Sequence, residues 1–97
     1  MYLHLGQTTV VTYNDIIGIF DLDTTTVSKT TRDYLSRAEN GGEVVNVSYD
    51  LPKSFIVCRD YGGEHKKIVY ISPISSATLL KRVNGNSSGN RQQETGD

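Results

Sequence analysis

The sequence predicts one small α+β domain: a mostly antiparallel sheet, one central helix and a short C-terminal helix. Three observations predict this class. Short runs rich in β-branched and aromatic residues recur along the chain, and turn residues separate them. One helical pattern at residues 28–39 lies between these runs. Near Ser72 and Pro73 the alternating pattern changes to apolar residues at three-residue steps, so a strand is expected to lead into a helix.

The N-terminal part of the chain predicts a hairpin followed by a buried strand. Residues 2–5 alternate, with Leu3 and Leu5 on one side, and residues 10–13 can return as the partner strand. Residues 16–20 form a continuous apolar run, which is typical of a strand covered on both faces. We therefore expect residues 16–20 to be the central strand of the sheet.

Residues 28–39 carry the clearest helical signals. Thr26 or Ser28 can cap the first turn, and glycines at positions 41 and 42 supply a left-handed stop. An apolar stripe on one face should meet the core, and it contains Val27, Thr31, Tyr34, Leu35 and Ala38. The opposite face is expected in solvent and carries Lys29, Arg32, Asp33 and Arg37.

The second half of the chain predicts three more strands and the last helix. Residues 44–49 alternate, and residues 54–59 and 67–71 are expected to pair antiparallel across a glycine-containing turn. Ser72 is expected to cap the last helix, with Pro73 at its first position. Two cations, Lys81 and Arg82, should close this helix because positive charge complements the negative end of the helix dipole.

We expect residues 1–82 to form the folded domain and residues 83–97 to be a disordered polar tail. The tail contains one apolar residue, Val83, and its small polar residues bury too little surface to offset their ordering entropy. The sequence starts with neither a basic segment nor a long apolar run, and no apolar run approaches membrane-spanning length. We therefore expect a cytoplasmic protein without membrane contact.

The charge of the chain is asymmetric. Residues 1–52 carry three cationic and seven acidic side chains, whereas residues 53–82 carry six and two. The second segment can therefore form a basic surface, although the isoelectric point of about 6.1 argues mildly against a dedicated nucleic-acid-binding domain. The six candidate DNA contacts are Lys53, Arg59, Lys66, Lys67, Lys81 and Arg82.

One acidic pair suggests catalysis. Asp21 and Asp23 follow an apolar run, as in the first motif of the haloacid dehalogenase-like phosphotransferases, and residues two apart on a strand point the same way. That family needs a doubly wound parallel sheet and further motifs, for which the 72 residues after Thr25 leave little room. We interpret the pair as part of a loop before the helix and expect no enzyme activity.

The single cysteine has two interpretations. Cys58 with His4 or His65 could form a thiol and base, but it lies in an apolar run that predicts a buried, inert thiol. Two histidines and one cysteine at unrelated spacings do not make a metal-ligand set. We therefore expect neither a metal nor a cofactor.

Four segments in combination resemble a known family. They are Tyr-Leu-His-Leu-Gly at residues 2–6, Asp-Ile-Ile-Gly-Ile-Phe-Asp at 15–21, Leu-Pro-Lys-Ser-Phe-Ile-Val at 51–57, and the stretch from Tyr-Ile-Ser-Pro to Leu-Leu-Lys-Arg at 70–82. Together they resemble the extracellular matrix regulatory protein family (RemA/RemB-like) of Gram-positive spore-formers, and the RemB branch more closely. The resemblance implies a transcriptional regulator of biofilm-matrix genes that forms ring-shaped homo-oligomers and binds DNA around a basic rim.

The chain departs from the RemA pattern where that branch places DNA-contacting arginines. Asp15, Leu51 and Pro52 occupy those positions, so the arginines cannot be carried over. We expect a non-enzymatic, oligomeric DNA-associated regulator that uses the six cations named above. The alternative is an oligomeric interaction module that acts through a protein partner without direct DNA binding. In both cases leucine and isoleucine side chains of edge strands and of the terminal helix are expected to be buried between subunits.

Overall fold

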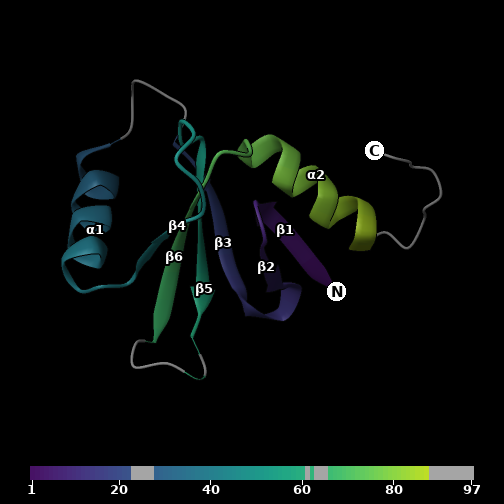
Figure 1. Ribbon diagram of the computed structural model, residues 1–97, viewed down its shortest axis with the longest axis horizontal. Helices are drawn as coiled ribbons and strands as arrows, with labels where there is room; N and C mark the ends of the chain where they lie inside the picture. Colours follow the sequence, from purple (N-terminus) through teal and green to yellow (C-terminus); the bar gives the residue numbers. More distant parts are fainter. Residues whose placement is uncertain (23–27, 61, 63–65, 88–97) are drawn as a thin grey trace.

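The computed structural model, which describes residues 1–22, 28–60, 62 and 66–87, is built in three layers (Figure 1). A four-stranded sheet of strand order β3-β5-β6-β4 forms the middle layer. Helix α1 lies on one face, and the β1–β2 hairpin and helix α2 lie on the other (Figure 1). In chain order the elements are β1 (Tyr2–Gly6), β2 (Thr9–Thr12), the 3₁₀ helix η1 (Tyr13–Asp15), β3 (Ile16–Asp21), α1 (Lys29–Asn40), β4 (Val44–Asn46), β5 (Ser54–Arg59), β6 (Lys67–Ser72) and α2 (Ser76–Ser87).

Strand β5 is the centre of the domain because both of its faces are buried. Phe55 and Val57 point toward α1, whereas Ile56 and Cys58 point toward the hairpin. The α1-side cluster consists of Ala38, Phe55, Val57 and Val69. The hairpin-side cluster consists of Leu3, Leu5, Val11, Val47, Ile56, Cys58 and Leu79.

The predicted hairpins are confirmed. Strand β1 pairs antiparallel with β2, and β5 pairs antiparallel with β6 from Ser54 opposite Ser72 to Arg59 opposite Lys67. The predicted strand at residues 44–49 is shorter than expected, since only β4 is extended, and it pairs parallel with β6. The sheet is therefore mostly, but not wholly, antiparallel.

The prediction that residues 16–20 form the central strand was wrong. Strand β3 is an edge strand that pairs only with β5 in the described sheet. Ile17 is 48% exposed and Phe20 is 46% exposed, although both belong to the continuous apolar run. A continuous apolar run predicts that the faces of a strand are buried, but it does not predict which strands pair with it.

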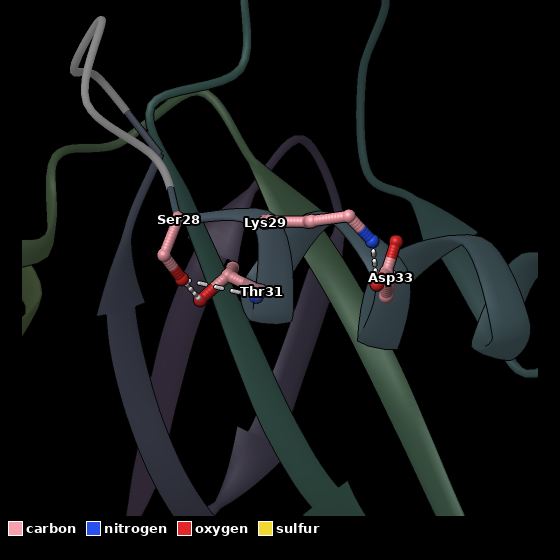
Figure 2. A network of polar contacts seen from close by, with 4 residues as sticks. All are labelled: Ser28, Lys29, Thr31 and Asp33. Carbon is pink, nitrogen blue, oxygen red and sulfur yellow. Dashed lines mark hydrogen bonds and ion pairs between the residues drawn. The ribbon is translucent and has the colours of Figure 1, made fainter.

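Helix α1 begins where its sequence predicts. The Ser28 hydroxyl accepts a hydrogen bond from the Thr31 amide at 3.1 Å, and Figure 2 shows this cap beside the Lys29–Asp33 ion pair at 3.0 Å. Gly42 ends the helix region with a φ of +74°, a conformation that glycine adopts without steric cost. Thr26 and Val27, the other expected cap and stripe residues, lie outside the described residues.

Helix α2 starts three residues later than expected and extends further. The Ser75 hydroxyl, not that of Ser72, caps it by accepting from the Thr78 amide at 3.2 Å. The buried Ser72 hydroxyl instead donates to the Leu5 carbonyl at 2.6 Å and accepts from the Ile74 amide at 3.0 Å. Ser72 therefore joins the hairpin layer to the sheet.

The predicted C-terminal end of the last helix was also wrong. Lys81 and Arg82 lie in the middle of α2 and do not close it, because the helix continues to Ser87. Val83 packs against the hairpin-side cluster, so the folded part of the chain includes the start of the predicted tail. Residues 88–97 lie outside the described residues.

Candidate nucleic-acid interface

Three of the six candidate cations lie together at the end of the β5–β6 hairpin. Arg59 and Lys67 are directly opposite each other in the ladder, and Lys66 precedes Lys67. All three side chains are exposed. The Arg59 guanidinium donates to the Asn14 carbonyl at 3.4 Å, so this end of β5 is linked to η1. We call Arg59, Lys66 and Lys67 the hairpin-end cations.

The two cations of α2 differ in their contacts. The Arg82 guanidinium donates to the His4 carbonyl at 3.3 Å, and the Arg82 carbonyl accepts from the Tyr13 hydroxyl at 3.4 Å. Arg82 therefore helps to fix α2 against the hairpin layer. Lys81 is exposed and forms no ion pair with a described residue.

Lys53 lies apart from the hairpin-end cations. It precedes the six residues of β5, whereas Arg59 ends that strand, and a strand rises about 3.3 Å per residue. The Cα atoms of these two residues are therefore roughly 20 Å apart. One protomer does not gather all six cations on a single small surface, and a ligand that contacts the whole set must be extended or must bind several protomers.

The lysines are the cations that the described structure leaves available. Lys53, Lys66 and Lys67 are exposed, and none of them pairs with a described carboxylate. A lysine ammonium on a flexible stem acts as a mobile point charge toward an anion. These side chains suit loose contact with a phosphate backbone better than recognition of one fixed group.

Two carboxylates reduce the positive field at the hairpin end. Burial raises the pKa of the Cys58 thiol from 9.0 to about 11, and the charge of Asp15 adds to this shift. Burial likewise raises the pKa of Tyr70, with smaller effects from Cys58, Asp60 and Asp15. Asp15 and Asp60 are thus close enough to act on groups in this part of the sheet. The hairpin end carries mixed charge with a modest cationic excess.

The thiol interpretation is settled by burial. Cys58 is 2% exposed in the hairpin-side cluster, and its raised pKa keeps it protonated at neutral pH. The expectation of a buried thiol is confirmed. His4 is exposed and its Nε2 lies 2.7 Å from the Gln7 carbonyl oxygen, where it donates. His65 lies outside the described residues.

The acidic pair after β3 lacks the framework that phosphotransferases of the haloacid dehalogenase type need. Asp21 ends an edge strand that pairs antiparallel with β5, and Asp23 lies outside the described residues. Over the described parts of the chain, no group of three or more His, Cys, Asp and Glu side chains is arranged to hold a metal ion. In the same residues no helix is long and apolar enough to cross a membrane.

Sequence reasoning missed two features of the surface. It did not foresee that Arg59 and Arg82 bond backbone carbonyls, because these contacts join residues 45 and 78 positions apart. It also did not foresee that two large side chains shortly before Lys53 are exposed: Tyr49 is fully exposed and Leu51 is 74% exposed. The second feature has a sequence signal, since Leu51 lies between turn residues and not within a strand.

Comparison with known proteins identifies the family. Residues 2–83 match the family described as extracellular matrix regulatory protein A-like (RemA-like). The chain is also 37% identical over 83 residues to extracellular matrix regulatory protein B of Bacillus subtilis (strain 168), an alignment that covers 86% of this chain and 90% of that protein. The family match spans β1 through most of α2, and so includes both the sheet and the hairpin-end cations. The chain belongs to the RemA-like family of extracellular matrix regulatory proteins.

Proposed function

We propose that this protein is a cytoplasmic, homo-oligomeric regulator of extracellular-matrix genes that associates with DNA and acts without catalysis. One observation carries the proposal. In a member of a family of matrix regulators, one end of the sheet presents three exposed cations, and its two lysines form no ion pair with a described residue. Such groups attract phosphates without reading bases.

Repetition would make these weak contacts effective. A protomer offers only the hairpin-end cations at one place, and Asp15 and Asp60 lie nearby. In a closed ring each subunit presents the same cations at equivalent positions, so several weak phosphate contacts act on one duplex at once. We infer a ring-like homo-oligomer with the hairpin ends on its rim. Lys53 and Lys81 are then secondary contacts for DNA that bends around the assembly.

Binding of duplex DNA across a salt series tests the proposal. We expect the affinity of the full chain to fall steeply as salt rises, by a log–log slope of about −0.9 for each phosphate contacted. The double variant Lys66→Gln/Lys67→Gln should weaken binding and make this slope shallower. The matched control is Lys29→Gln/Arg37→Gln, which removes the same charge from the exposed face of α1.

The outcomes separate a surface effect from an effect of net charge. The control variant should bind as the unmodified chain does. Equal weakening by both double variants would show that overall charge, not the hairpin end, governs binding. Binding that is undetectable at low salt, or that does not change with salt, would overturn the DNA part of the proposal.

A second candidate function is an oligomeric interaction module that acts through a protein partner. It is favoured by the fully exposed Tyr49 and the largely exposed Leu51, which are apolar side chains on a loop. Exposed apolar groups of this kind are typical of protein contacts. Affinity purification of the full chain from native lysate, with Leu51→Ser as the comparison, tests this candidate. Recovery of nucleic acid without any protein that depends on Leu51 would contradict it.

A further inference from the structure

The outer edge of β3 is an open pairing surface. The Leu22 amide donates to the Lys53 carbonyl at 2.9 Å on the β5 side. Because the bonding direction alternates along an antiparallel strand, the amide and carbonyl of Phe20 also face β5, and those of Ile19 face the outer edge. No further described strand pairs with β3 on that side. Ile19 therefore presents a donor and an acceptor in the geometry that a second strand would use.

The side chains beside this edge are apolar and only partly covered. The Phe20 ring stacks on Phe55 with centroids 4.9 Å apart and an interplanar angle of 19°. It also leans over Gly18, where an added Cβ would lie 2.6 Å from the ring. Phe20 is 46% exposed, so one side of the Phe20–Phe55 stack is open to solvent at β3. Ile17, which is 48% exposed, precedes Gly18 on the same strand.

The two edges of the sheet are built differently. Strand β4 has three residues, and a short edge strand offers little for pairing. Strand β3 has six residues, without lysine or proline, and its one charged residue, Asp21, is at its end. Proteins usually protect long edges with charge, proline or short length. The irregularity of β3 is a register shift between Ile16 and Gly18, so the regular stretch from Gly18 to Asp21 is the part of this edge that a second strand can pair with.

We propose that a second copy of this chain covers this edge, by antiparallel pairing of β3 with the partner's β3 about a two-fold axis at Ile19. This inference rests on the self-association in the proposed function and names the surface that mediates it. In this register Gly18 lies opposite the partner's Phe20, so a small residue faces a large one. The Phe55–Phe20 stack then continues across the axis into the matching stack of the partner.

The charges of the strand fit this arrangement. Each Asp21 lies two residues from the axis, so the two carboxylates of a dimer are roughly 14 Å apart, beyond the screening length at physiological salt. Antiparallel pairing brings each Asp21 toward the end of the partner's sheet where Arg59 and Lys67 lie with Asp15 and Asp60, so the charges at that end are mixed. The self-complementary apolar centre, in which Gly18 faces the partner's Phe20, favours a second copy over an unrelated strand. This two-fold contact makes a dimer, and a ring requires a second surface elsewhere on the domain.

Light scattering of the full chain over a range of concentrations tests the surface. We expect a mass of at least twice 10.7 kDa for the unmodified chain and a smaller mass for Ile17→Glu, because this register places the new carboxylate opposite the partner's Asp21. The matched control is Val45→Glu on the other edge, where the side chain is similarly exposed at 40%. Circular dichroism and a cooperative thermal transition verify that each variant is folded.

The control variant should keep the mass of the dimer at least. A mass that is unchanged by Ile17→Glu would overturn the β3 contact while leaving self-association intact. Dissociation by Val45→Glu and not by Ile17→Glu would place the contact on β4 and overturn the β3 contact equally. A monomeric unmodified chain would overturn both the contact and self-association, whereas loss of DNA binding with intact assembly would affect only the proposed function.

Discussion

Strands β3 and β5 pair with each other and are both rich in apolar residues, yet their surroundings differ. Strand β5 is buried on both faces and flanked by strands on both sides, whereas β3 has one open side and two half-exposed apolar side chains. The continuous apolar run of β3 predicted the more central position. The difference shows that a strand with a continuous apolar sequence can remain partly exposed in the single subunit of a small domain.

Truncation of one isoleucine to alanine in each strand should give the largest difference in the free energy of unfolding. Ile56→Ala in β5 removes a fully buried side chain, so we expect the free energy of unfolding to fall by about 2–5 kcal/mol. Ile17→Ala in β3 should cost less than about 1 kcal/mol in the dissociated chain, because solvent already reaches this side chain. Urea denaturation at low protein concentration measures both values. Equal costs would show that the monomer buries β3 as deeply as β5.

The close contact between Gly18 and Phe20 provides the next test of the comparison. An added Cβ at Gly18 would lie 2.6 Å from the Phe20 ring, so Gly18→Ala must displace the ring and should cost about 1–3 kcal/mol. After Phe20→Ala removes the ring, the same substitution should be neutral or slightly stabilising, since alanine restricts the unfolded chain more than glycine does. A double-mutant cycle by urea denaturation measures this coupling. Additive effects would contradict it.

The burial of Cys58 in β5 should make the free energy of unfolding depend on pH in the alkaline range. The folded-state pKa of Cys58 is about 11, raised from 9.0. Below pH 9 the thiol is protonated in both states, and its contribution to stability is fully present. Between pH 9 and 11 the unfolded chain loses this proton and the folded chain keeps it, so the free energy of unfolding should fall by roughly 1–2 kcal/mol.

The control for this measurement is Cys58→Ala, which should show a shallower decline over the same pH range. Other groups that titrate there contribute to both proteins, so the difference between the two curves isolates the thiol. Identical curves would contradict the burial argument. A thiol-specific reagent should also react slowly with the folded chain at neutral pH and rapidly in urea.

The local features of the fold could be predicted from the sequence, whereas features set by distant contacts could not. Alternation and a short turn predicted β5, β6 and their antiparallel pairing, and Ser28 was among the predicted caps of α1. The cap of α2 was misassigned because several serines lie near its start. The Ser72 hydroxyl instead donates a hydrogen bond to the Leu5 carbonyl, 67 positions away.

The candidate site shows the same division. The six cations could be listed from the sequence, but their grouping depends on strand length and on which ends meet. Arg59 and Lys67 are brought together by the hairpin, while β5 separates Lys53 from both. The lateral order of strands likewise depends on tertiary pairing, so it could not be deduced from the apolar run of β3.

Hydrogen exchange at the Ile19 amide tests the central claim most directly, because this amide faces the open edge of β3. The Ile56 amide, in the interior strand β5, serves as the reference in the same sample. We predict that Ile19 exchanges slowly where the chain is associated and loses protection on dilution, while Ile56 stays protected throughout. Rapid exchange of Ile19 at concentrations where light scattering finds an assembly would contradict the claim that a second copy pairs with β3.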